Sequence, residues 1–290
     1  MRYGIPPSGA MDQYSYQVGN LIVGNPEGFA SLEISLYGLI LEAISTVTVA
    51  ITGGDLSPLL NGTPALHWTR LVLQKGDVLH FKKRVKGFRA YLAVRGGLIV
   101  PEILNSKSTF LRGKIGTALK KGDLLSIGDF GLQPPGDFPV TLPKEYIPDL
   151  VSNDPVLVLM GPQEDYYTPK GIETFLNSPY RITSQSDRMG YRTEGPPIEV
   201  AKGPGIITEP IPRGSIQVPG DGKPIILLRD AQVTGGYGKI ATVVSAHMDR
   251  LGQRAPGDTL RFQKISRDHA IDMMLEEKRK WDALRRLFVP

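Results

Sequence analysis

Short apolar runs separated by turn residues dominate the chain and predict strands more than helices. Residues 46–51 (TVTVAI) form a run rich in β-branched residues, and residues 224–228 (PIILL) form an apolar run. Both runs have the length of a typical strand. Asn61-Gly62 is a dipeptide typical of a two-residue β-hairpin turn. The 33 glycines and 24 prolines imply many further turns, so the pattern predicts an all-β fold with few helices.

A weak internal repeat supports two similar β units. Residues 76–81, 122–127 and 257–262 each begin with Gly-Asp and continue as a short apolar run. A turn at Gly-Asp followed by a strand explains all three segments. Repetition of this kind predicts two related β-barrels, although the pattern is common enough to recur by chance.

A proline-rich stretch divides the chain. Residues 132–149 hold five prolines without any periodicity, which is typical of a linker. We therefore predict a first β-barrel half with an early helix in residues 1–134 and a second barrel in residues 150–266. Residues 267–290 are predicted to form a separate C-terminal helix.

Two segments have helical periodicity. In the first, Asp12 is placed to cap a helix whose apolar stripe includes Tyr14, Val18, Leu21 and Ile22. Residues 24–26 (GNP) then predict its end. Apolar residues also recur at three- and four-residue spacing from 268 to 288, with charges between them, which predicts an amphipathic helix. It either packs on its own barrel, which we favour, or docks a partner protein.

A polar cluster follows the apolar run at residues 224–228. Asp230, Gln232 and Thr234 recur at period two, so a continuing strand would place all three on one face. Gly235 and Gly236 come next, where the missing side chains let a ligand or another backbone approach closely. We interpret this segment as one wall of a small polar site. A solvated strand face that ends in an ordinary turn explains the pattern about equally well.

A second candidate site surrounds Gly190. Arg188 offers a planar fork for a carboxylate or phosphate, and Tyr191 offers a phenolic donor. Both are predicted to bind substrate. The alternative is that Arg188 pairs with Asp187 or Glu194 and braces a barrel.

Two carboxylates are the candidates for catalysis. Asp230 lies in the polar cluster, and Asp12 could act as a general base. The predicted capping position makes a structural role for Asp12 about as plausible.

Missing residues exclude several chemistries. The chain has no cysteine, so it has no disulfide and no thiolate nucleophile. Its four histidines form no zinc-binding motif, so no metal site is expected. There is no G-x-x-x-x-G-K-[S/T] phosphate loop and no Met-Lys-Met turn for biotin attachment.

Charge and hydropathy add little. The net charge of +5 is modest, and no nucleic-acid motif accompanies its basic clusters, so we expect no nucleic-acid partner. No apolar run is long enough to span a membrane, and no secretory signal precedes the first motif. We expect a cytoplasmic protein.

Five short motifs, in order along the chain, carry a resemblance to a known family. It contains the C subunit of bacterial 5-oxoprolinase, the KipA antagonist of a sporulation kinase inhibitor, and the carboxyltransferase region of urea amidolyase, and it is often called biotin-dependent carboxyltransferase-like. Each motif is weak alone, but their order and spacing together are specific. They are residues 4–12 (GIPPSGAMD), 20–25 (NLIVGN), 89–97 (RAYLAVRGG), 106–109 (SKST) and 186–192 (SDRMGYR).

The resemblance implies a fold and three possible functions. The fold would be tandem cyclophilin-like β-barrels. The first function is that of the C subunit of an ATP-dependent 5-oxoprolinase. Its partners would be the other two subunits, which are KipI-like (B) and LamB/YcsF-like (A), and the complex would need ATP. The second function is that of a KipA-like regulatory protein that binds a kinase inhibitor. The third is that of a carboxyltransferase-type protein that acts on a urea-like amide with a separate biotin carrier.

Overall fold

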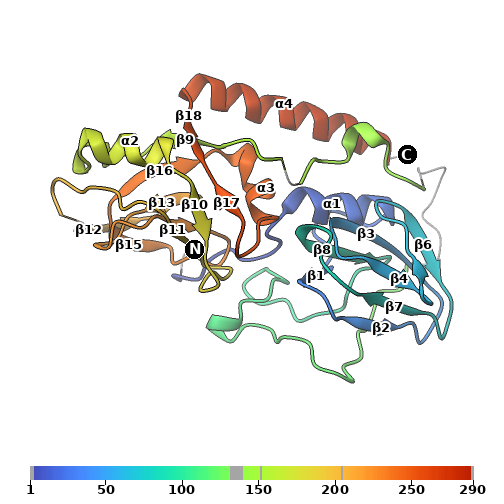
Figure 1. The fold of residues 1–290 in the computed structure, drawn as a ribbon. Helices are drawn as coiled ribbons and strands as arrows, with labels where there is room; N and C mark the ends of the chain where they lie inside the picture. Colours follow the sequence, from blue (N-terminus) through green and yellow to red (C-terminus); the bar gives the residue numbers. More distant parts are fainter. Residues whose placement is uncertain (1–2, 131–139, 151, 204, 289–290) are drawn as a thin grey trace. The chain divides into compact units, whose positions relative to one another are not determined.

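The computed structural model describes residues 3–130, 140–150, 152–203 and 205–288, and within them the chain is mostly strands with four α-helices (Figure 1). It separates into two compact units. Unit 1 comprises Met1–Met11 and Ser152–Glu276, and unit 2 comprises Asp12–Val151 and Glu277–Pro290. Each unit is thus discontinuous in sequence. This differs from the linear division predicted above, because the first eleven residues group with the second half of the chain.

Unit 1 contains a nearly closed barrel. Its sheet, as far as the structure describes it, has eight strands, and all neighbouring pairs are antiparallel except β9 with β18. The two outermost strands are separated only by Arg261, so one short segment forms both edges of the sheet. In order across the sheet, the strands are β17 (Thr259–Leu260), β10 (Tyr180–Ile182), β11 (Gly190–Glu194), β14 (Ile225–Leu227), β13 (Ser215–Gln217), β16 (Lys239–Val243), β9 (Val156–Met160) and β18 (Phe262–Lys264).

Aromatic and aliphatic side chains fill this barrel. Phe175 of α2 (Pro169–Asn177) stacks on Phe262, with ring centroids 4.7 Å apart, and both side chains are buried. Thr168 caps α2 by accepting a hydrogen bond from the backbone N–H of Gly171. Unit 1 also holds the short helix α3 (Met248–Gly252) and a two-stranded ribbon formed by β12 (Gly205–Pro210) and β15 (Thr234–Tyr237).

Unit 2 contains two sheets of four strands each, counted over its described residues. The first consists of β1 (Leu32–Ser35), β8 (Lys86–Val94), β3 (Val47–Asp55) and β6 (Arg70–Leu73), in that order. The second consists of β2 (Ile40–Glu42), β7 (Val78–Phe81), β4 (Pro58–Leu60) and β5 (Thr63–Pro64). Apolar residues from both sheets form one buried cluster, so the sheets pack face to face. Tandem barrels are therefore not confirmed.

Helix α1 (Gln13–Ile22) covers the other face of the first sheet, where Val18 and Ile22 pack with Ala50 and Ala93 (Figure 1). The prediction for this helix is confirmed. Asp12 caps it by accepting a 2.9 Å hydrogen bond from the backbone N–H of Ser15.

The turn predictions had mixed outcomes. Asn61 and Gly62 adopt φ values of 51° and 85° between β4 and β5, which confirms the hairpin. The run at residues 224–228 is confirmed as β14. The predicted strand at residues 122–127 is wrong, because Ile127 makes a single bridge to Leu98 in place of a ladder. Leu124 in that stretch is 78% exposed, so burial of its side chain contributes little to ordering this segment.

Helix α4 (Arg267–Arg286) occupies most of the segment with the amphipathic pattern. In unit 2, Leu284 and Phe288 are buried in the cluster beneath α1, and Trp281 meets Tyr14 edge-on at 5.9 Å. No helix among the described residues combines the length and the apolar character needed to cross a bilayer.

The predicted linker lies partly outside the described residues, at positions 132–139. Its remaining part is not a free connection, since Leu142 is buried in the same cluster as α1.

Candidate functional site

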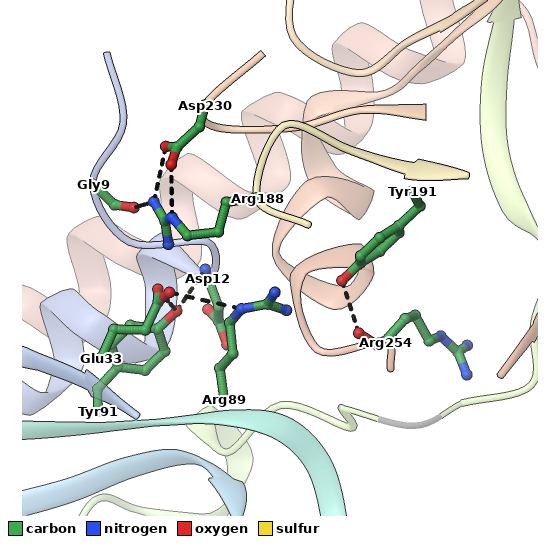
Figure 2. A network of polar contacts seen from close by, with 9 residues as sticks. All are labelled: Gly9, Asp12, Glu33, Arg89, Tyr91, Arg188, Tyr191, Asp230 and Arg254. Carbon is green, nitrogen blue, oxygen red and sulfur yellow. Dashed lines mark hydrogen bonds and ion pairs between the residues drawn. The ribbon is translucent and has the colours of Figure 1, made fainter. Parts of the chain in front are cut away.

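A bidentate ion pair in unit 1 joins Arg188 to Asp230 (Figure 2). The guanidinium donates from Nε to Oδ2 at 3.0 Å and from Nη2 to Oδ1 at 3.1 Å, which is a bidentate pair. Nη2 also donates to the carbonyl oxygen of Gly9 at 2.5 Å. The side chain of Asp230 is 10% exposed and that of Arg188 is 30% exposed, so solvent reaches the pair mainly from the arginine side.

Local turns place these two side chains. Asp187 accepts hydrogen bonds from the backbone N–H groups of Met189 and Gly190, which fixes the turn that precedes β11. The backbone N–H of Asp230 donates to the carbonyl of Arg188 at 2.9 Å. A backbone hydrogen bond and an ion pair therefore both join the loop of Arg188 to the loop of Asp230. The observed partner of Arg188 is thus Asp230, which the alternative with Asp187 or Glu194 did not include.

The predicted strand face of Asp230, Gln232 and Thr234 is wrong. Strand β14 ends at Leu227, the chain turns at residues 229–230, and β15 begins only at Thr234. Asp230 is buried, whereas the side chains of Gln232 and Thr234 are exposed. The apolar pattern could not show this turn, because the contact that holds it comes from Arg188, 42 residues earlier.

Gly235 and Gly236 serve the close approach of protein atoms in this structure. A Cβ at Gly235 would lie 2.4 Å from Cδ1 of Ile211, and one at Gly236 would lie 3.3 Å from the carbonyl oxygen of Ile206. Both glycines belong to β15, which pairs with β12. The atoms that approach these glycines in the structure thus belong to the protein itself. Contact of the two glycines with substrate stays a prediction.

Tyr191 lies in the barrel core. Its side chain is 1% exposed, and its hydroxyl donates a 2.7 Å hydrogen bond to the carbonyl oxygen of Arg254 (Figure 2). In this position the phenol braces the loop after α3. The structure does not bring it to the Arg188–Asp230 pair as a second substrate donor.

In unit 2, Asp12 is fully engaged as a helix cap. Its Oδ1 accepts from the backbone N–H of Ser15, and its Oδ2 accepts from the hydroxyl of Ser15 at 2.5 Å. The Asp12 backbone N–H donates to the hydroxyl of Tyr91, which itself donates to Glu33 at 2.8 Å (Figure 2). Burial and then the charges of Glu33 and Asp12 raise the pKa of Tyr91 well above its ordinary value. The geometry favours capping, and a role for Asp12 as a general base stays a prediction.

A further polar cluster was missed from the sequence. Lys239, whose side chain is 4% exposed, forms an ion pair with Glu209, and the amide of Gln163 donates to the same carboxylate oxygen at 2.8 Å. The hydrogen bonds from Lys239 and then Gln163 lower the pKa of Glu209. A lysine that directly precedes the apolar run at residues 240–244 was the available signal.

Among the residues that the structure describes, no group of three or more His, Asp and Glu side chains is arranged to hold a metal ion.

Comparisons with known proteins give consistent results. The family profile described as "Carboxyltransferase domain, subdomain A and B" matches residues 3–264. The C subunit of 5-oxoprolinase from Haemophilus influenzae is 32% identical over 286 residues, which is 99% of this chain and 91% of that protein. The urea amidolyase of Saccharomyces cerevisiae is 32% identical over 285 residues, but the chain covers only 15% of it. The crystal structure of Kluyveromyces lactis urea carboxylase superimposes with a TM-score of 0.88 at 32% identity, over 97% of this chain and 27% of that one.

Proposed function

Because the chain belongs to the family of carboxyltransferase domain subdomains A and B, we propose that it is the C subunit of an ATP-dependent 5-oxoprolinase. In this role it helps to open 5-oxo-L-proline to L-glutamate together with the other two subunits of the complex, which are KipI-like and LamB/YcsF-like. The complex uses ATP, for which this chain has no phosphate-loop motif. One observation carries the proposal: a relative named for this role matches over 91% of its own length, whereas a urea amidolyase matches over 15%.

The Arg188–Asp230 pair supports a way of binding the substrate. 5-Oxoproline carries a carboxylate with the same two-oxygen geometry as the Asp230 side chain, so it can replace that side chain on the arginine fork. The exposure of Arg188, at 30%, leaves the fork within reach of a ligand. The exchange keeps the guanidinium paired, and the contacts of the bound substrate must offset the cost of leaving the Asp230 carboxylate without its cation.

Asp230 then has a second task in this proposal. Once displaced from Arg188, its carboxylate lies beside the bound substrate and can accept a proton from the attacking water. The lactam oxygen is first phosphorylated by ATP, which leaves as ADP. Water then adds to the activated lactam carbon, the C–N bond breaks, and the ring nitrogen takes up the proton accepted by Asp230 and becomes the amine of glutamate. A second water releases phosphate from the resulting acyl phosphate. Gln232, Thr234, Gly235 and Gly236 are proposed to face the KipI-like partner, with the two exposed side chains contacting substrate there.

The test is turnover by the reconstituted complex of all three subunits, measured as glutamate formed from 5-oxoproline and ATP. Arg188→Lys keeps the charge but loses the bidentate fork, so we expect the KM for 5-oxoproline to rise about tenfold. Asp230→Asn should lower kcat. Asp187→Asn is the matched control, because an exposed asparagine can still accept the backbone hydrogen bonds of that turn. Absence of glutamate with the wild-type complex refutes the proposal.

A second candidate is carboxyl transfer to a urea-like amide. It is favoured by the TM-score of 0.88 with a urea carboxylase, and it requires a biotin carrier on another polypeptide. Capture of the native complex on avidin, followed by carboxylation of urea, would support this function over lactam opening.

A further inference from the structure

A small cavity lies where the two edge strands of the unit 1 barrel, β17 and β18, meet at Arg261, a place that we call the seam. Its volume is about 170 Å³, and it is lined by Asn153, Asp154, Val156, Arg254, Thr259, Leu260 and Arg261. This is well below the roughly 300–1,000 Å³ of pockets for drug-sized ligands, so only a small molecule fits. None of these residues belongs to the site proposed above for lactam opening.

The seam explains why a cavity forms here. The chain pairs with β10 through β17, passes through Arg261, and then pairs with β9 through β18. The carbonyl of Arg261 accepts from the backbone N–H of Val156 at 2.7 Å, so the switch in pairing is rigidly held. Leu260 and Val156 are almost fully buried and provide an apolar floor.

Positive charge dominates the walls. Arg254 and Arg261 line the cavity, and the Asp154 carboxylate lies 3.7 Å from Arg250. Two lining arginines against one lining aspartate leave a formal charge of +1 on the cavity walls, and Arg250, outside the lining, offsets the charge of that aspartate. Asp154 also accepts a hydrogen bond from the hydroxyl of Ser152, so its carboxylate is already paired with neighbouring protein groups. An anion is the ligand that this balance favours.

Arg254 is held in place before any ligand arrives. Its residue is 8% exposed, its Nη2 donates to the carbonyl of Ser152, and its own carbonyl accepts from the Tyr191 hydroxyl. Figure 2 shows its side chain leading away from that hydrogen bond. A guanidinium that is already ordered loses little conformational entropy on binding, which strengthens an anion contact.

We propose that this seam cavity binds a small oxyanion, with Arg254 and Arg261 as its principal donors and Thr259 and Asn153 as supplementary polar groups. Guanidinium groups match the geometry of both carboxylate and phosphate oxygens. The oxyanion is therefore either inorganic phosphate or the carboxylate of a small metabolite, and binding measurements separate the two. This site is independent of the function proposed for Arg188 and Asp230.

Isothermal titration of the full chain tests the proposal. Phosphate, L-glutamate and 5-oxo-L-proline are titrated separately at a constant ionic strength set with chloride. Arg261→Gln should weaken binding of whichever anion binds by about tenfold, equivalent to about 1.4 kcal/mol. Arg254→Lys should weaken it similarly, because a lysine lacks the fork. Arg267→Gln, on the exposed start of α4, removes the same charge outside the cavity and should change affinity less than twofold.

Three results would overturn the proposal: no binding of any of the three anions, equal weakening by Arg261→Gln and Arg267→Gln, or no effect of Arg261→Gln. Arg261 is exposed, so its substitution reports on binding even if Arg254→Lys fails to fold. Crystals soaked in selenate, a phosphate-shaped anion with an anomalous signal, supply the location. A peak between Arg254 and Arg261 supports the site, and a peak elsewhere without one there refutes it.

Discussion

Replacing Asp230 with asparagine removes one charge from the Arg188 pair while keeping almost the same shape. The carboxylate now accepts two hydrogen bonds from the guanidinium, at 3.0 and 3.1 Å. An asparagine offers one acceptor oxygen, and its amide group points a donor at the other arginine donor. The substitution therefore costs one charge-assisted hydrogen bond and creates a repulsive contact. We expect unit 1 to be destabilised.

The size of the effect follows from the burial of the pair. Breaking a fully buried ion pair costs about 3–5 kcal/mol, and a hydrogen bond to a charged group contributes about 1.5–3 kcal/mol. Asp230 is 10% exposed, but Arg188 is 30% exposed, so water recovers part of the loss on the arginine side. We expect the free energy of unfolding to fall by about 2 kcal/mol. For a unit of this size, that lowers Tm by roughly 4–8 °C.

Calorimetry of a double-mutant cycle measures the interaction directly. Arg188→Met, Asp230→Asn and the double variant are compared with the wild type and with the control Asp187→Asn. When one partner of the pair has been replaced, replacing the second breaks no further interaction. The loss in free energy of unfolding of the double variant should therefore be at least about 1 kcal/mol smaller than the sum of the losses of the two single variants. If the two costs add to within about 0.5 kcal/mol, the pair is not coupled and the reasoning about this site is wrong.

Three further predictions concern residues other than that pair. Tyr191→Phe should lower the free energy of unfolding by about 1–2 kcal/mol, measured by urea denaturation, because the buried carbonyl of Arg254 loses its donor; an unchanged midpoint would contradict the observed contact. Burial, followed by the charge of Arg250, lowers the pKa of His247 from 6.5 to about 4, so the unfolded chain binds more protons between those pH values. Stability should therefore fall as pH drops from 6.5 towards 4, and Tm measured across this range should decline less steeply for His247→Gln than for the wild type. Asp12→Ala should cost about 1 kcal/mol of stability through loss of the α1 cap, whereas Asp12→Asn should restore most of it in the same thermal melts.

Features that depend on near neighbours could be predicted from the sequence. Asp12 caps α1 through a residue three positions away, and the Asn61-Gly62 turn joins strands that lie immediately beside it. In each case the interacting groups lie within a few residues, so local pattern contains the information that sets the conformation.

The candidate site could be predicted only as a set of residue types. Arg188 and Asp230 are both recognisable as candidates, but their pairing spans 42 residues, and the contact of Arg188 with Gly9 spans 179. Period-two alternation does not continue past the end of β14, and nothing in the apolar pattern shows that an arginine elsewhere holds a turn there. Tyr191 was predicted as a ligand donor because a phenol suits that task, whereas its burial depends on the closure of the whole barrel.

The discontinuity of unit 1 sets a limit on when this protein can fold during synthesis. Gly9 is translated 179 residues ahead of its partner Arg188, and the segment that closes the barrel extends to Lys264. The segment that contains Gly9 and Met11 therefore stays without its unit 1 partners while the strands of unit 2 are translated. Until then its apolar residue Met11, which ends buried in the unit 1 core, is available to chaperones. Slow translation or truncation before residue 264 should prolong that exposure, which links the yield of this protein to the completion of the unit 1 barrel.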